Sequence, residues 1–212
     1  MGLYPGGMLM DIKSEQIEPL DPRSVKLFEA GIPVFVRYGY RKTTVEEICR
    51  AAGMSKRTFY ELFKDKADFF ARAVFRSNEI LIYEWLDNLS EGLNAIAKIE
   101  YFIEFYTRSL IKQPINRVLI SEPETMGAMG SLGHDIMVSP ITAIMAQFIE
   151  QGKAEKVFRE QDTEIAVLMV FSLLDSMYWL GPAIFGFEFA DDKSILDSEI
   201  RAFVLRGLGV VR

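Results

Sequence analysis

The chain of 212 residues has very little cysteine and histidine, with Cys49 and His134 as its only examples. One cysteine cannot form an intrachain disulfide, and one cysteine with one histidine cannot build a metal cluster. The sequence also lacks the HExxH helix, the glycine-rich phosphate loop and the Gly-x-Ser-x-Gly elbow of common enzymes. Glu122 and Glu124 lie close together, but they flank Pro123, and we interpret them as an exposed turn. We therefore expect no enzyme activity, no cofactor and no metal site.

Export and membrane signals are missing as well. The N-terminus has no basic flank, apolar core and small-residue cleavage site of a signal peptide. Residues 165–187 are almost continuously apolar, which leaves a membrane span as an alternative. Asp175 lies inside that segment, Glu164 and Glu188 flank it, and no Lys or Arg cluster stands at its ends. We favour a helix that is buried on most sides, in a cytoplasmic protein without membrane contact.

Charge is divided unevenly along the chain. The whole sequence has 24 Lys and Arg against 30 Asp and Glu, a net charge of −6. Between Pro22 and Arg76, twelve Lys and Arg face six Asp and Glu, so this part carries +6 and the remainder −12. Phosphate contacts need cations only where the duplex lies. A basic module on an acidic body is therefore typical of a DNA-binding protein with a second, separate domain.

The first helix is marked by its start and by one internal proline. Asp21 followed by Pro22 is typical of a capped helix start, and apolar residues then recur at helical spacing as far as Val36. Pro33 lies inside this helix, where it removes a backbone donor and crowds the preceding turn. We expect a kink or a break there.

Three further helix starts follow at short intervals. Thr44 and Glu47 form the pattern of a capping box for a second helix that ends near residue 52. Gly53 turns the chain, Ser55 caps a third helix, and Asp65 caps a fourth. The pattern predicts four short helices between residues 22 and 76.

The second and third helices have the spacing of a helix-turn-helix. Ile48 and Ala52 before the turn can share a core with Phe59 and Leu62 after it. The opening of the third helix is then free to enter a major groove. An Ala-Ala-Gly turn alone would also fit an ordinary helical hairpin, so the basic charge and the capped starts decide the interpretation.

Each exposed side chain near this turn suits a DNA contact. Arg57 can donate two hydrogen bonds to guanine O6 and N7, and Lys56 can contact guanine or phosphate. Thr58 suits a contact with thymine or with an oxygen of the DNA backbone. Tyr60 and the residues at the helix starts are assigned to phosphate. The predicted DNA-binding residues are Thr43, Thr44, Ser55, Lys56, Arg57, Thr58, Tyr60, Lys64 and Lys66.

The string TTVEEICRAAGMSKRTFYELFKDK, with Gly39-Tyr40 before it, resembles the N-terminal domain of the tetracycline-repressor (TetR) family. The resemblance covers about residues 22–76 through the Gly-aromatic pair, Thr-Thr, Ala-Ala-Gly, Ser-Lys-x-Thr-Phe-Tyr and Phe-x-x-Lys, in that order. Pro33 departs from the usual uninterrupted first helix. The resemblance implies an all-α fold in which a three-helix, helix-turn-helix DNA-binding domain precedes a larger helical ligand-binding and dimerisation domain.

The resemblance also implies a pocket for a small effector in the helical body. Aromatic residues and methionines there favour an apolar or aromatic effector, although most residues of such stripes simply fill a core and His134 could instead cap a helix. The candidate ligand-binding residues are Tyr101, Phe102, Phe105, Met126, His134, Met137 and Phe148.

Members of the family dimerise through their last two long helices. The apolar segment 165–187 and a final periodic helix from 195 to 208 suit a two-fold, four-helix contact. The candidate interface residues are Leu168, Phe171, Ser172, Asp175, Trp179, Ile200, Phe203 and Val204. Two reading helices about 34 Å apart would require a pseudo-palindromic operator.

The sequence thus predicts three parts: a flexible arm at 1–20, a DNA-binding domain at 21–68 and an effector-binding and dimerisation domain at 69–212. The predicted function is that of a homodimeric transcriptional regulator, a repressor released from double-stranded operator DNA by a small molecule. The alternative is a helical dimer that binds a small molecule or a protein and no longer reads DNA. Binding at varied salt separates the two, because phosphate contacts give a steep salt dependence.

Overall fold

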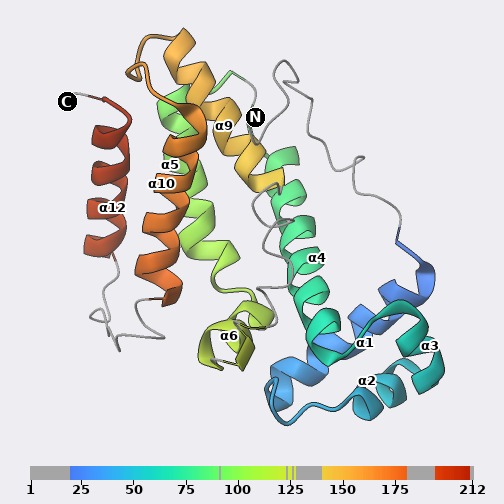
Figure 1. Ribbon diagram of the computed structural model, residues 1–212. Coiled ribbons are helices and arrows are strands. Elements are labelled where there is room, and N and C mark those ends of the chain that lie inside the picture. The colour runs from blue at the N-terminus through green and yellow to red at the C-terminus, as the bar shows by residue number, and fades with distance from the viewer. Residues whose placement is uncertain are drawn as a thin grey trace.

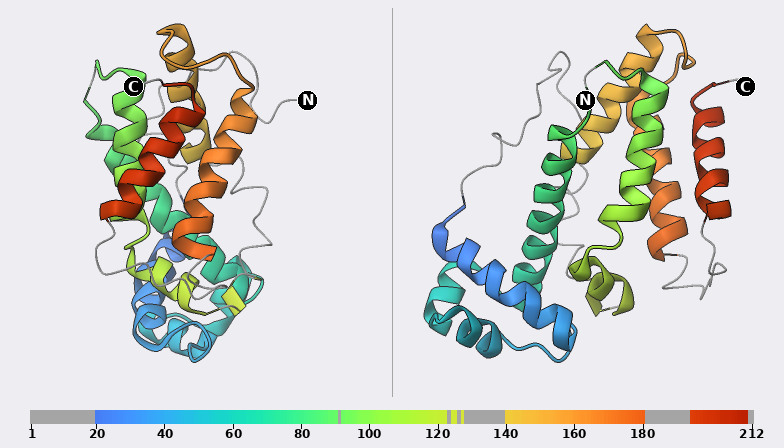
Figure 2. Two further views of the ribbon diagram at one scale, coloured as in Figure 1. Left: turned by 90° about the vertical axis from the view of Figure 1, so that its left-hand side faces the viewer. Right: turned by 180° about the vertical axis from the view of Figure 1, so that it is seen from behind.

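The computed structural model describes residues 20–90, 92–122, 124–125, 127, 140–180 and 194–210. Over these residues the secondary structure is helical, as predicted (Figure 1). Three helices, α1 (Pro22–Tyr38), α2 (Val45–Ala52) and α3 (Lys56–Leu62), lie together at one end. Helix α4 (Lys66–Asp87) begins beside them and runs into the rest of the molecule (Figures 1 and 2).

Helix α1 begins as predicted and passes through Pro33. The Asp21 carboxylate accepts a hydrogen bond from Arg23 N at 2.8 Å, and Pro22 occupies the first turn. Of the two outcomes expected at Pro33, a kink or a break, the break is wrong, since the helix is continuous to Tyr38. Pro33 is exposed on the outer face, so its ring leaves the buried side of the helix, with Leu27 and Phe35, undisturbed.

The caps of the next three helices are those that the sequence predicts. Thr44 Oγ1 accepts from Glu47 N at 3.2 Å, and the Glu47 carboxylate accepts from Thr44 N at 2.8 Å, which completes a capping box. Ser55 Oγ accepts from Thr58 N at 3.0 Å, and the Asp65 carboxylate accepts from Asp68 N at 2.9 Å. The fourth helix, α4, continues past residue 76 to Asp87.

The buried hydrophobic side chains of the described residues form two separate cores. The first joins α1, α2 and α3 to the first half of α4 and to α6 (Pro114–Ser121). We call α1 to α3, with α4 up to Val74, the head. The core of the head consists of Leu27, Phe28, Phe35, Ile48, Cys49, Ala52, Phe59, Phe63, Phe69, Phe70, Ala73 and Val74, and α6 adds Ile115, Val118 and Leu119.

The second core belongs to a bundle that we call the body. It contains α5 (Ala95–Phe105), α9 (Pro140–Ala154), α10 (Thr163–Asp175) and α12 (Ser194–Gly207), which lie side by side (Figure 2). Two π-helical turns, η2 (Tyr106–Leu110) and η3 (Ser176–Leu180), continue α5 and α10. The proposed domain boundary after residue 68 falls inside α4, whose later residues Ile82 and Trp85 join this second core. Among the described residues, no helix combines the length and apolar character needed to cross a lipid bilayer.

Candidate DNA-reading surface

The turn between α2 and α3 has the geometry that its sequence predicts. Gly53 adopts a left-handed conformation, with φ 63° and ψ 35°, which a residue without a side chain reaches most easily. Met54 N then donates to Cys49 O at 2.9 Å. On either side of the turn, Ile48 and Phe59 are fully buried. The two helices are therefore fixed against each other by their inner faces.

The outer face of α3 is exposed. The Arg57 side chain is 89% exposed and Tyr60 is 56% exposed, while Phe59 between them is completely buried. Lys56 is exposed as well, and Thr58 is half-buried with its hydroxyl 2.9 Å from Ser55 Oγ. The short helix thus anchors one face in the core and presents a cationic and aromatic face to solvent.

Acidic side chains of the head neutralise these cations. Lys56 Nζ donates to Glu46 Oε2 at 2.8 Å, and Arg57 Nε donates to Glu61 Oε1 at 3.2 Å. The bond from Lys56 lowers the pKa of the Glu46 carboxyl, and the same bond raises the pKa of Lys56. Both pairs are exposed, so each holds its cation weakly. A phosphate can therefore replace either carboxylate at little cost.

Two of the residues assigned to phosphate remain available at the edges of this surface. Thr44 is exposed, although its hydroxyl is engaged in the capping box. The first intrahelical bond of α2 runs from Ile48 N to Thr44 O, so the amides before it lack an acceptor within the helix. Lys64 is exposed in the turn before α4, where its backbone N–H donates to Asp68 at 2.9 Å.

Two assignments are corrected by the structure. Thr43 is 1% exposed and donates its hydroxyl to Gly39 O at 2.8 Å, so it cannot contact DNA from this position. Lys66 is half-buried, and its ammonium donates to Tyr40 O at 2.8 Å and Thr43 O at 2.9 Å. Burial lowers the pKa of Lys66. Both side chains hold the turn between α1 and α2.

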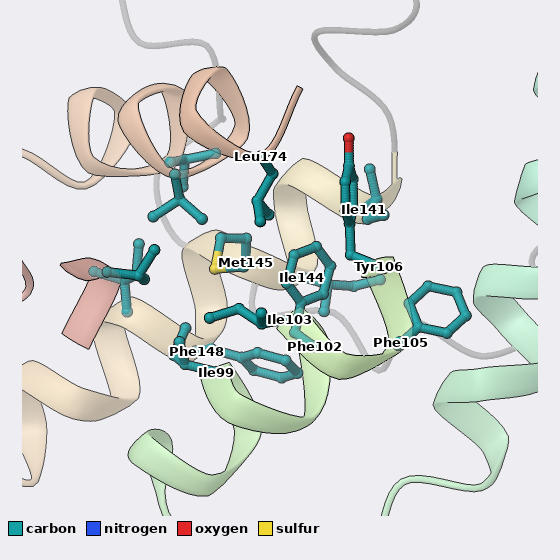
Figure 3. Packing of buried hydrophobic residues seen from close by; sticks show 14 of the residues in the cluster. Ile99, Phe102, Ile103, Phe105, Tyr106, Ile141, Ile144, Met145, Phe148 and Leu174 are labelled. Atoms are coloured by element: carbon teal, nitrogen blue, oxygen red, sulfur yellow. The ribbon is translucent and has the colours of Figure 1, made fainter. Parts of the chain in front are cut away.

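The aromatic candidates for the effector site lie within the core of the body (Figure 3). Phe102, Phe105 and Phe148 are almost fully buried, whereas Tyr101 is partly exposed and stacks on Trp85 with ring centroids 5.5 Å apart. Met126, His134 and Met137 lie outside the described residues. A mainly apolar hollow of about 260 Å³ lies elsewhere, between α1 and α4.

The candidate interface residues divide between solvent and core. Phe203 is 68% exposed, Leu168 is 36% exposed, and Ser172 is exposed. Ile200 and Val204 are each 4% exposed and pack in the core of their own chain, so their assignment to a partner's surface is corrected.

Phe171 and Asp175 also turn toward the chain's own body. The Phe171 ring contacts those of Phe102 and Tyr106 at 5.6 and 6.3 Å. Asp175 accepts a hydrogen bond from the Tyr106 hydroxyl, and burial raises the pKa of the Asp175 carboxyl. We therefore remove Asp175 from the interface. The side chain of Trp179 lies outside the described residues.

Sequence patterns missed the contacts of three acidic side chains, Glu46, Glu122 and Asp175. Glu46 could have been found, because it lies one turn before Arg50 on an exposed face, where an i, i+4 pair is expected. The Tyr106–Asp175 contact and the contact of Glu122 with the α1–α2 turn join residues 69 and 82 positions apart. No local spacing could have revealed these two.

Residues 27–73 match the family model of bacterial regulatory proteins, tetR family. Two curated proteins are similar over most of their length. The TetC protein of transposon Tn10 from Escherichia coli is 24% identical over 149 residues, which are 68% of this chain and 74% of TetC. The transcriptional regulator AcuR from Cereibacter sphaeroides is 24% identical over 163 residues, 73% of this chain and 70% of AcuR.

Solved structures share the fold at low sequence identity. The fatty acid degradation regulator FadR from Bacillus halodurans superimposes with a TM-score of 0.66 at 18% identity, over 92% of this chain and 100% of FadR. FadR from Bacillus subtilis, in complex with stearoyl-CoA, gives a TM-score of 0.61 at 16% identity, over 89% of this chain and 99% of that one. Head and body thus occur together in other proteins with this architecture.

Proposed function

Because the chain belongs to the TetR family of ligand-responsive, DNA-binding transcriptional regulators, we propose that it is a homodimeric repressor, released from a palindromic operator by an apolar or aromatic small molecule. It is a transcription factor and not an enzyme. The observation that carries the proposal is the outer face of α3, where Arg57 and Tyr60 are exposed beside the buried Phe59. We place the protein in the cytoplasm, where it can reach its operator.

The proposed DNA contacts follow from chemistry and exposure. Arg57 reads guanine through its two-pronged guanidinium, and Lys56 contacts guanine or phosphate once it leaves Glu46. Thr58 contacts a thymine methyl or a backbone oxygen, and Tyr60 contacts phosphate. Thr44, Ser55 and Lys64 lie at the edges of the same surface and position the head on the duplex. The predicted DNA-binding domain, residues 21–68, remains the proposed unit of recognition.

The proposed dimer uses the exposed apolar side chains of α10 and α12. These helices leave large side chains in solvent that a soluble monomer would be expected to cover. The exposed residues are Ile165 at 52%, Leu168 at 36%, Met169 at 64%, Ile195 at 69% and Phe203 at 68%. A second copy that brings the same surface would cover them with two-fold symmetry. Such a dimer places two heads on one operator, so the operator should be palindromic.

The proposed effector is apolar or aromatic, in keeping with the composition of the body. Phe102, Phe105, Phe148 and the neighbouring isoleucines pack in the core of the body (Figure 3). The effector would bind against these side chains, and the predicted Tyr101, Met126, His134 and Met137 remain candidates for the edge of its site. The buried Tyr106–Asp175 pair offers a polar anchor among these apolar side chains. FadR from Bacillus subtilis, which binds stearoyl-CoA, supports an effector with a large apolar part.

The test is selection of bound sequences from a random duplex pool, followed by titration of the selected duplex at several salt concentrations. A dimeric reader selects a palindrome and loses affinity steeply as salt rises. The rival proposal, a ligand- or protein-binding dimer that no longer reads DNA, predicts no enrichment. The exposed cations of α3 favour the first proposal, since they have only exposed and weakly held partners.

A further inference from the structure

One carboxylate of the chain's second half binds the backbone of the head. Glu122 directly follows α6, and its two oxygens accept hydrogen bonds from Tyr40 N at 2.7 Å and Arg41 N at 2.8 Å. Both amides belong to the turn between α1 and α2. A carboxylate that accepts two backbone N–H groups makes stronger bonds than a neutral acceptor would.

The turn is shaped to receive this carboxylate. Gly39 adopts φ 81°, a conformation that side chains rarely allow, and the next two N–H groups then point toward Glu122. A Cβ atom on Gly39 would lie 2.3 Å from Glu122 Oε1. The backbone conformation therefore favours glycine at this position, and a Cβ atom there would also displace the carboxylate.

The opposite side of the same turn is also held. Lys66 Nζ donates to Tyr40 O and Thr43 O, and its ammonium lies 4.3 Å from the centre of the Tyr40 ring. An anion thus binds the amides and a cation binds the carbonyls of the same short turn. The turn leads directly into Thr44, the cap of α2. Its position sets where α2, and with it α3, begins.

Helix α6 connects this contact to the body. It follows the π-helical turn η2 after a short link, and η2 contains Tyr106, which binds Asp175 at the end of α10. In Figure 1, α6 lies beside the end of α1, between the head and the body. The apolar side chains of α6, Ile115 and Leu119 among them, pack in the core of the head.

We propose that Glu122 couples the conformation of the body to the conformation of the DNA-reading head. The inference rests on the proposed function, because it assigns a route for regulation of that same surface. A shift of α6 moves the carboxylate, the carboxylate moves the α1–α2 turn, and the turn moves the start of α2. Linkage is reciprocal, so DNA bound at the head must stabilise α6 through the same contact.

The test measures hydrogen–deuterium exchange in the full-length protein with and without the duplex selected from the random pool. In the wild type, the duplex should slow exchange in α2 and α3, and also in α6, by roughly fivefold or more. In Glu122→Ala the protection of α2 and α3 should persist, while the protection of α6 should fall well below that of the wild type, although Ile115 and Leu119 still pack against the head. Glu122→Gln keeps one acceptor oxygen and should fall between the two.

Glu124→Gln is the matched control. Glu124 lies two residues further on and, within the described part of the chain, pairs with the exposed Arg41 side chain rather than with the backbone of the turn. This variant should retain the wild-type protection of α6. Equal protection of α6 in the wild type and in Glu122→Ala would overturn the coupling role alone, whereas a wild type that binds no duplex would overturn the proposed function as well.

Discussion

Replacing Phe59 with alanine removes the side chain that fixes the reading helix to the head. Phe59 is completely buried, and its ring lies 5.4 Å from that of Phe63 and 5.3 Å from that of Phe69. Truncating a buried phenylalanine costs about 3–5 kcal/mol through lost transfer free energy and the cavity left behind. Small domains have only about 5–15 kcal/mol of stability in total. The head of Phe59→Ala should therefore be close to unfolding at ambient temperature.

The assay uses the unequal distribution of tryptophan. Both tryptophans, Trp85 and Trp179, follow the head in sequence, and Trp85 packs in the core of the body. Fluorescence during urea unfolding thus reports the body, while far-UV circular dichroism reports both parts. Phe59→Ala should move a fraction of the dichroism transition to lower urea and leave the fluorescence transition almost in place.

The adjacent Tyr60 gives the control. It is 56% exposed on the same helix, so Tyr60→Ala should change stability by no more than about 0.5 kcal/mol while weakening DNA binding. A Phe59→Ala protein in which both transitions shift together would refute the separation of the two cores. Unchanged unfolding would refute the anchoring role of Phe59.

Three further predictions follow from the caps, the buried acid and the exposed apolar surface. Thr44→Ala removes the side-chain acceptor of the Glu47 N–H from the capping box, and should lower the free energy of unfolding by about 0.5–2 kcal/mol in urea titrations; Thr44→Ser should restore most of it. Burial raises the pKa of Asp175, so the folded state disfavours its charge, and the wild type should lose stability relative to Asp175→Asn as pH rises through that raised pKa. Below the ordinary aspartate range the difference should stop changing with pH, and a difference that is independent of pH throughout would contradict the burial argument. Phe203→Glu should convert the proposed dimer to monomer by light scattering at micromolar concentration, whereas Glu199→Gln, an exposed neighbour on α12, should not; a dimer in both would place the interface elsewhere.

Local signals in the sequence predicted the helix starts of the head well. A cap is a contact within three residues, so Asp21, Thr44, Ser55 and Asp65 could be recognised from spacing alone. The break predicted at Pro33 does not occur, although proline removes a backbone donor there, because the rest of α1 is held by its buried face, and the sequence does not show how strongly that face is held.

Assignments that depend on tertiary packing were less predictable. Thr43 and Thr44 are neighbours of the same type, yet one hydroxyl turns into the head and the other caps α2. On α12, Ile200 and Val204 pack inward while Phe203 points to solvent, and a helix that is apolar on several faces does not reveal which face its own chain covers. The bonds of Glu122 join parts of the chain that are about 80 residues apart.

The central claim is that the outer face of α3 reads DNA, and Arg57→Ala tests it most directly. Arg108→Ala is the matched control, because Arg108 is an exposed arginine of the body, bound to an acidic residue four positions away, as Arg57 is. Both variants should be titrated against the selected duplex and against duplexes altered at each guanine. We expect Arg57→Ala to lose about 1–3 kcal/mol and its preference at one guanine of each half-site, while Arg108→Ala binds as the wild type does. Equal affinity and equal base preference in the two variants would contradict the account.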